Sequence, residues 1–219
     1  PDLQPEYIDS YEIGIQKNIN ASFVSLEGYH RVTNNKIERI QTVLDQNTFL
    51  LSIDNLSRDF STGAELIINY QHKKWLTVNT SLNYYYYRLE GTVNNAEIDR
   101  ENNQWNNRTG VSVRTKSNTR FQLNTFYSGP SVTAQGERGD FFFSNFAVRQ
   151  DFFDRSLSLT LRIRDIFGTA KHEFTSSGEN FRSYFEFNRE SPVVSVSATY
   201  RINNYKSRER RQQEEMERR

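Results

Sequence analysis

Residues 157–164 read LSLTLRIR, and this short stretch decides the class of fold. Apolar side chains occupy every second position from Leu157 to Ile163, and Ser, Thr or Arg stands between them. Successive side chains of a β-strand point to opposite faces, so this pattern predicts a strand with one apolar and one polar face. The same alternation recurs in residues 10–16, 60–70, 76–87, 109–116, 121–128 and 194–202. The sequence therefore predicts an all-β protein.

The spacing of these segments predicts about nine long strands in up-and-down antiparallel order. Their expected ranges are 7–19, 21–44, 48–70, 75–90, 105–116, 120–134, 140–150, 155–175 and 181–202. Short turns are expected at 17–20, 71–74, 116–119 and 151–155, polar tips near 45–47 and 176–180, and longer loops at 91–104 and 129–139. Short turns at one end and long loops at the other are typical of a transmembrane β-barrel.

The composition favours a membrane barrel over other classes of fold. Only 35% of the 219 residues are hydrophobic and the mean hydropathy is −0.80, but 14% are aromatic, unlike a disordered chain. No apolar run approaches the ~20 residues of a membrane helix, whereas the alternating residues of a barrel average out in bulk hydropathy. The alternative is a soluble β-sandwich, but the strands expected here exceed the ~5–6 residues usual in soluble sheets.

Motifs for catalysis or cofactor binding are absent from the sequence. The chain has no cysteine, and His30, His72 and His172 do not have the spacing of metal ligands. No nucleophile elbow, zinc-protease motif or phosphate loop occurs. With 28 basic and 27 acidic residues, the net charge of +1 provides no field that would attract nucleic acid. We therefore expect no catalytic residue, cofactor, metal or nucleic-acid partner.

Charged residues on the predicted polar faces are expected to form structural ion pairs. The carboxylates are Glu12, Glu27 and Glu65, and the candidate partners are Arg31, Arg114, Arg162 and Arg164. A catalytic carboxylate pair is the less favoured alternative. Gly136 and Gly139 are expected in tight turns.

An ordered series of motifs resembles the C-terminal barrel of TonB-dependent outer-membrane receptors, and most closely their outer membrane β-barrel family branch. Residues 2–14, DLQPEYIDSYEIG, resemble a mid-barrel stretch with Pro-Glu and Tyr-Glu-x-Gly elements, and residues 25–40 resemble the strand that follows it. Residues 55–70, NLSRDFSTGAELIINY, are similar to a strand with a Gly-x-Glu element. RDIFG at 164–168 resembles the end of the penultimate strand, and SATYRIN at 197–203 resembles the terminal strand.

The resemblance implies that residues 1–205 are the C-terminal part of a transmembrane barrel of about 22 strands, filled by an upstream plug domain. It implies a transporter in the outer membrane of a Gram-negative cell that imports an unidentified metal chelate, vitamin, glycan or peptide. The implied partners are outer-membrane lipid, the upstream plug and strands of the same protein, and TonB. Residues 206–219 depart from the family as a charged polar tail, which we expect to be solvated.

Two other functions remain open at this point. A small self-contained barrel, porin-like or structural, would suit about eight to ten strands, although an odd strand count disfavours it. An outer-membrane hydrolase is less favoured, because it needs His, Ser and Asp side chains clustered near one rim.

Substrate contacts are expected in the long loops, because loops on a rigid scaffold commonly carry binding residues. The candidates are Asp99, Arg100, Trp105, Glu137 and Arg138. We expect these loops outside the cell and the turns at 71–74 and 151–155 in the periplasm. Within this chain, the edge strands near Tyr11 and Tyr200 are expected to lack a second partner.

Overall fold

The computed structural model describes residues 3–45, 48–93, 95–178 and 181–202, and the predicted tail at 206–219 lies outside these ranges. No described segment forms a helix long and apolar enough to cross a membrane. The strands are β1 (Tyr7–Ile19), β2 (Ser22–Asn34), β3 (Ile37–Asp45), β4 (Thr48–Asn55), β5 (Arg58–His72), β6 (Leu76–Val93), β7 (Ala96–Arg114), β8 (Thr119–Ser128), β9 (Ser131–Thr133), β10 (Gly136–Arg138), β11 (Phe141–Phe152), β12 (Leu157–Arg164), β13 (Lys171–Gly178), β14 (Phe181–Asn188) and β15 (Val193–Tyr200).

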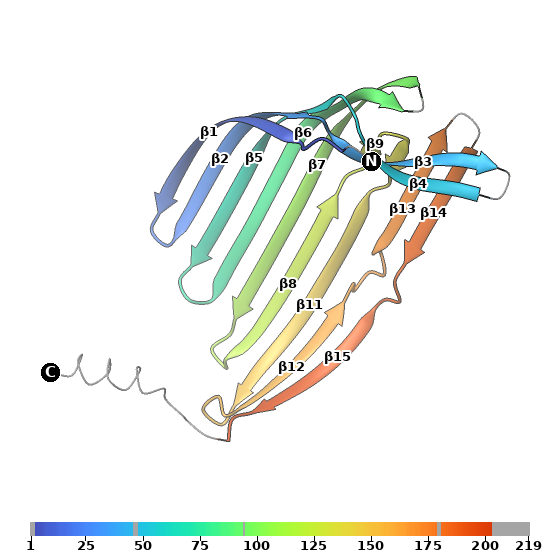
Figure 1. The fold of residues 1–219 in the computed structure, drawn as a ribbon. Helices are drawn as coiled ribbons and strands as arrows, with labels where there is room; N and C mark the ends of the chain where they lie inside the picture. The colour runs from blue at the N-terminus through green and yellow to red at the C-terminus, as the bar shows by residue number, and fades with distance from the viewer. Residues whose placement is uncertain (1–2, 46–47, 94, 179–180, 203–219) are drawn as a thin grey trace.

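Nine of these strands form one antiparallel sheet in the order β1-β2-β5-β6-β7-β8-β11-β12-β15. Each of them corresponds to one predicted strand, so the prediction of an all-β antiparallel fold is confirmed. The sheet is curved, and it is not closed, because β1 and β15 lie at its two edges (Figure 1). The closed barrel of about 22 strands that the resemblance implies is therefore not observed in this chain.

Five predicted strands are each divided into two, which corrects the prediction of continuous strands. The divisions produce the pairs β2 and β3, β4 and β5, β8 and β9, β12 and β13, and β14 and β15. Asn35 and Asp165 adopt positive φ values of 56° and 49° just after β2 and β12, and Pro130 and Pro192 lack the N–H that a ladder needs. The outer pieces form separate sheets, β3-β4 and β14-β13-β10-β9.

The segments predicted as long loops are mostly strand. β6 pairs with β7 from Leu76 opposite Val113 out to Val93 opposite Ala96, so residues 91–93 and 96–104 belong to one long hairpin. Beyond the apolar part of this hairpin, the Arg88 guanidinium lies 2.7 Å from the Asp99 carboxylate on the neighbouring strand and 3.0 Å from Glu90 on its own strand. Such cross-strand pairs stabilise a solvated ladder without any apolar alternation. Residues 129–139 likewise contain the short hairpin β9–β10.

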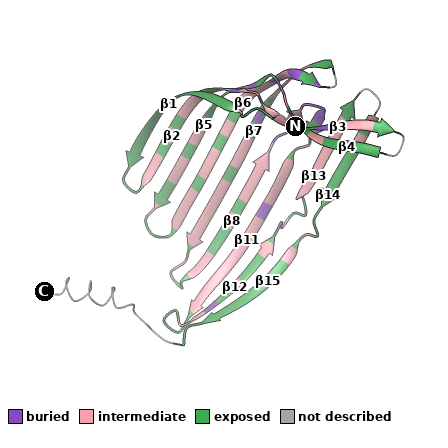
Figure 2. Cartoon of the chain, viewed as in Figure 1, coloured by how far each residue is buried: buried purple, intermediate pink, exposed green. Residues whose placement is uncertain are grey.

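The two faces of the nine-stranded sheet differ in chemistry. One face carries apolar side chains that lie opposite one another in consecutive strands, as in the row Val78, Val111, Leu123, Phe146, Ile163 and Val194. Many of these side chains are exposed, and the exposed fraction reaches 81% at Ile13 and 73% at Val196. The other face carries mainly Ser, Thr, Asn, Arg and Glu. Figure 2 shows that few residues along these strands are buried, so the apolar face lacks a protein covering among the described residues.

A small apolar core lies where the outer hairpins meet the sheet. It contains Ile40, Leu56, Leu89, Val93 and Ala134, and Tyr87 and Ile98 pack against it. Leu89 is fully buried. This core holds the outer hairpins together at one end of the sheet.

Candidate functional site

A hollow of about 660 Å³ opens among the outer hairpins, at the end of the sheet opposite the short turns. Figure 1 shows β3–β4 and β13–β14 gathered at this end of the molecule, with β9 beside them. The walls include Gln41, Val93, Ile98, Arg100, Gln135 and Phe181. Its volume lies within the ~300–1,000 Å³ usual for ligand pockets, and its walls combine apolar surface with a few polar groups, as ligand sites do.

Gln135 joins three of the chain segments that form the hollow. Its side chain accepts a hydrogen bond from the backbone N of Gln41 at 2.7 Å and donates one to the backbone O of Gln41 at 2.9 Å. Its own backbone O accepts from the backbone N of Ser177 at 2.6 Å. Phe49 of β4 also packs edge-on against Phe181 of β14, with ring centroids 6.4 Å apart. These contacts fix the walls relative to one another.

A network of charged and polar side chains supports the start of β3. The Lys36 Nζ lies 3.3 Å from a Glu6 carboxylate oxygen and 3.9 Å from one of Asp59, and the Tyr87 hydroxyl donates to Asp59 at 3.0 Å. The backbone N–H of Ile37 donates to Glu6 at 2.7 Å, and this bond, with Lys36, holds the pKa of Glu6 below its usual value. The bend between β2 and β3 is therefore held by charge as well as by packing.

The structure separates Asp99, Arg100 and Trp105, which lie on β7 and not in a loop. Arg100 lines the hollow. Asp99 points to the opposite face, where its two oxygens accept hydrogen bonds from Arg88 at 2.7 and 2.8 Å; these bonds hold the pKa of Asp99 below its usual value. Trp105 lies on the apolar face, is 43% exposed, and stacks on Tyr127 with ring centroids 4.1 Å apart.

Glu137 and Arg138 lie on β10, close in sequence to Gln135, and both are exposed. The Arg138 guanidinium lies 5.2 Å from the centroid of the Phe174 ring. The expected tight turn at Gly136 is wrong, because this residue is in β10, where an added Cβ would lie 1.8 Å from the carbonyl O of Thr175. Only glycine permits β10 to approach β13 so closely. Substrate contact by Asp99, Arg100, Trp105, Glu137 and Arg138 remains a prediction.

Sequence reasoning missed Gln41, Gln135 and Phe181 as wall residues of the hollow. Two local signals were available, the turn-forming Asn34–Asn35 pair and Pro130, which mark the starts of the outer hairpins. Neither signal shows which hairpins meet, because that depends on residues far apart in the chain.

The predicted ion pairs on the polar face are found in part. The Arg31 guanidinium lies 2.6 Å from the Glu12 carboxylate across β1 and β2. Glu27 and Glu65 face each other across β2 and β5, and within the described ranges neither forms an ion pair. The described ranges also contain no group of three or more His, Asp or Glu side chains placed to hold a metal ion.

Comparison with known proteins identifies the family. Residues 1–200 match the sequence profile of the Outer membrane protein beta-barrel family. The chain belongs to this family. Neither the curated proteins nor the solved structures gave a match. Membership of the Outer membrane protein beta-barrel family locates the protein in the outer membrane of a Gram-negative cell, and an antiparallel sheet with one apolar and one polar face is the architecture that such a barrel requires.

Proposed function

We propose that this chain is the C-terminal part of a TonB-dependent outer-membrane transporter that imports a substrate not yet identified. The observation that carries the proposal is the open sheet, in which β1 pairs only with β2 and β15 only with β12 among the described residues. Unpaired backbone N–H and C=O groups cannot remain in lipid. The proposal therefore includes further strands that complete the barrel, and the motif resemblance supports a position for them upstream in the same protein.

The two faces of the sheet have separate roles in this proposal. The apolar face, with exposed Leu159, Val194 and Val196, contacts outer-membrane lipid. The polar face, with Glu12, Arg31 and their neighbours, lines the interior and contacts the upstream plug domain. A water-filled or plugged interior is the environment in which a continuous face of Ser, Asn, Arg and Glu is stable.

The hollow among the outer hairpins is the proposed first contact for the substrate. Arg100 supplies charge, Gln41 and Gln135 supply amide groups, and Ile98 and Phe181 supply apolar surface. The remaining predicted contacts do not line this hollow: Asp99 and Trp105 lie elsewhere on β7, and Glu137 and Arg138 lie on β10. We infer a non-enzymatic role. An assay of the full protein with fluorogenic esters and peptides tests that inference, and turnover would contradict it.

Disulfide formation between the edge strands tests the open sheet. The chain has no cysteine, so engineered pairs in the full protein, one thiol at Ile13 or Ile15 of β1 and one at Val194 or Val196 of β15, report directly on contact. We expect no disulfide between β1 and β15, because other strands lie between them. The control pair is Leu26 and Leu66, which face each other across β2 and β5 and should cross-link. Efficient β1–β15 cross-linking would contradict the proposal.

The coupling to TonB needs a test of its own. The immobilised periplasmic domain of TonB should retain the full protein from detergent extract, and should not retain a variant that lacks the segment upstream of the barrel. Equal retention of both proteins, or of neither, would argue against energised transport.

A small self-contained barrel is the second candidate function. The strand number of the sheet supports this candidate, because the sheet has nine strands and the smallest outer-membrane barrels have about eight. In that case residues 1–219 alone should give a monodisperse, heat-modifiable monomer in detergent. The transporter proposal expects the same fragment to aggregate through its two free edges.

A further inference from the structure

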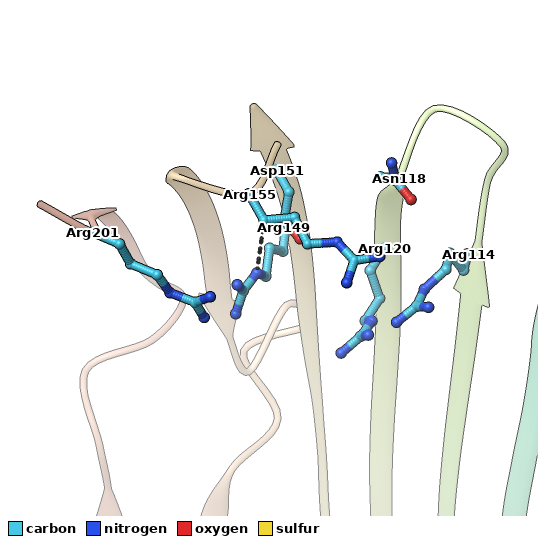
Figure 3. Close-up of a pocket in the computed structure, with 7 residues that line it drawn as sticks. All are labelled: Arg114, Asn118, Arg120, Arg149, Asp151, Arg155 and Arg201. Carbon is cyan, nitrogen blue, oxygen red and sulfur yellow. Dashed lines mark hydrogen bonds and ion pairs between the residues drawn. The ribbon is translucent and has the colours of Figure 1, made fainter. Parts of the chain in front are cut away.

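A second hollow, of about 210 Å³, lies at the opposite end of the sheet, among the short turns. Five arginines line it, namely Arg114, Arg120, Arg149, Arg155 and Arg201, together with Asn118 and Asp151. They come from β7, β8, β11, the β11–β12 turn and the residue that follows β15. Figure 3 shows their guanidinium groups extending toward the space that the side chains enclose. We refer to these five residues as the arginine cluster.

The sheet register forces three of these arginines into one row. Arg114 lies directly opposite Arg120, and Arg120 lies directly opposite Arg149, so three adjacent strands carry like charges side by side. Like charges directly opposite in an antiparallel pair destabilise the sheet. This row lies on the polar face, because Val113, Phe121 and Val148 at the adjacent positions belong to the apolar face. The protein therefore carries an electrostatic cost at this position.

Little of this positive charge is neutralised within the described residues. Asp151 accepts from the Arg149 Nε at 2.9 Å and from the Ser158 hydroxyl at 2.7 Å, and Arg149 also donates to Ser158 at 2.8 Å. The other four arginines of the cluster form no ion pair in the part of the chain that the structure describes. The cluster thus retains four positive charges beyond the Arg149–Asp151 pair, directed into one small space.

Backbone geometry holds two members of the cluster in place. Arg155 adopts a φ of 69° in the β11–β12 turn, a left-handed conformation that is uncommon for arginine. The backbone N of Arg201 donates to the carbonyl O of Ser156 at 2.8 Å, so this residue continues the pairing of β12 and β15 beyond the strand end. The backbone of Arg155 is therefore fixed by the turn, and the backbone of Arg201 is fixed by pairing with β12.

We propose that the arginine cluster binds a phosphate-type oxyanion that carries more than one negative charge. The planar donors of a guanidinium match phosphate oxygens in pairs, and several guanidiniums around one space suit a compact multivalent anion. The small volume fits a single phosphate or pyrophosphate group better than a large organic ligand. The group belongs either to a free phosphate compound or to a phospholipid headgroup, and both sources share this chemistry. The proposal does not depend on TonB-dependent transport.

Binding of pyrophosphate to the full protein in detergent tests the free source. Mixed micelles that contain phosphatidic acid, whose phosphomonoester group can carry two negative charges, test the headgroup source, with phosphatidylcholine micelles as the comparison. Arg120→Gln, at the centre of the row, should weaken binding about tenfold or more, and Arg120→Lys should weaken it less. The control is Arg162→Gln, on the polar face of β12 but outside the hollow, which should bind as the wild type does. Heat-modifiable gel mobility reports folding of each variant.

Pyrophosphate binding that depends on Arg120 and not on Arg162 supports a free phosphate compound. Binding restricted to phosphatidic acid micelles with the same dependence supports a headgroup. Equal loss of binding in the Arg120 and Arg162 variants, or no binding of either probe by the folded wild type, overturns the proposal.

Discussion

Single side chains within the recognised motifs connect elements that are distant in sequence. The Asn55 side chain donates to the backbone O of Gln4 at 2.9 Å and of Asn35 at 2.7 Å, and accepts from the backbone N of Gln4 at 2.8 Å. Glu6 binds the backbone N of Ile37 in the same region. The Pro-Glu motif and the Asn that opens the motif at 55–70 therefore hold the segment before β1 against the bends at the two ends of the β3–β4 hairpin.

Gly63, in the Gly-x-Glu motif, gives a prediction at the same scale. A Cβ added at Gly63 would lie 2.4 Å from the Tyr85 Cβ and 2.5 Å from the Tyr84 carbonyl O. Gly63→Ala should therefore force β5 and β6 apart and lower the free energy of unfolding by about 1–3 kcal/mol. Gly28→Ala on β2 is the matched control, since its nearest atom would be 3.9 Å away. Urea unfolding of the full protein measures both variants, and equal midpoints would show that this close approach is wrong.

The alternation in LSLTLRIR gives a second prediction for single residues. Leu159 is 39% exposed on the apolar face, whereas Thr160 lies on the polar face between Arg149 and Ser197. Leu159→Arg should destabilise the protein more than Thr160→Arg, because the side chain at 159 faces lipid near the start of β12 whereas the side chain at 160 meets water. Membrane yield and heat-modifiable mobility report the difference. Equal tolerance of both substitutions would contradict the assignment of faces.

Among the elements, the junction between β12 and β13 depends on one carboxylate. Asp165 is 2% exposed and accepts hydrogen bonds from the backbone N of Thr169 at 3.1 Å and of Ala170 at 2.9 Å. Its own backbone N donates to the Asn145 side chain at 2.9 Å. The Asp-Ile-Phe element of the sequence is thus the point at which the sheet strand ends and the chain turns into the outer hairpin.

This junction should make stability depend on pH. Burial alone would raise the pKa of Asp165, but the N–H groups of Ala170 and Thr169, with hydroxyl donors, outweigh burial and lower it. A lowered folded pKa contributes stability above the unfolded value of about 3.9, and the contribution is lost as pH falls through the folded value. At pH 7, Asp165→Asn should therefore be about 1–3 kcal/mol less stable than the wild type.

The difference between Asp165→Asn and the wild type should disappear as the pH falls below about 4. Urea unfolding of both proteins between pH 7 and pH values below about 4 measures this difference in stability. Asp154→Asn, at an exposed position in the β11–β12 turn, is the control and should leave stability nearly unchanged at every pH. A constant difference between wild type and Asp165→Asn at all pH values would exclude the carboxylate as the cause.

At the scale of the whole molecule, the two ends of the sheet should face different compartments. Asn95 lies at the tip of the β6–β7 hairpin with a φ of 66°, and Lys73 lies in the β5–β6 turn with a φ of 50°, at opposite ends of β6. Barrels of this kind have short turns in the periplasm and longer segments outside. A cysteine at Asn95 should react with an impermeant thiol reagent on whole cells, and one at Lys73 should react only after lysis. The reverse labelling pattern would contradict this orientation of the sheet in the membrane.

The sequence alone determined the strand faces, the number of strands in the main sheet and the family, because alternation with a period of two is a local property of extended chain. The tertiary structure decided where the long strands bend and how the outer hairpins meet. Those bends depend on bonds between distant residues, such as Gln135 with Gln41 and Asn55 with Gln4, and no local pattern records them. The arginine cluster could not be predicted from the sequence for the same reason. Its members are spread over residues 114–201, and the pairing of the strands brings them together.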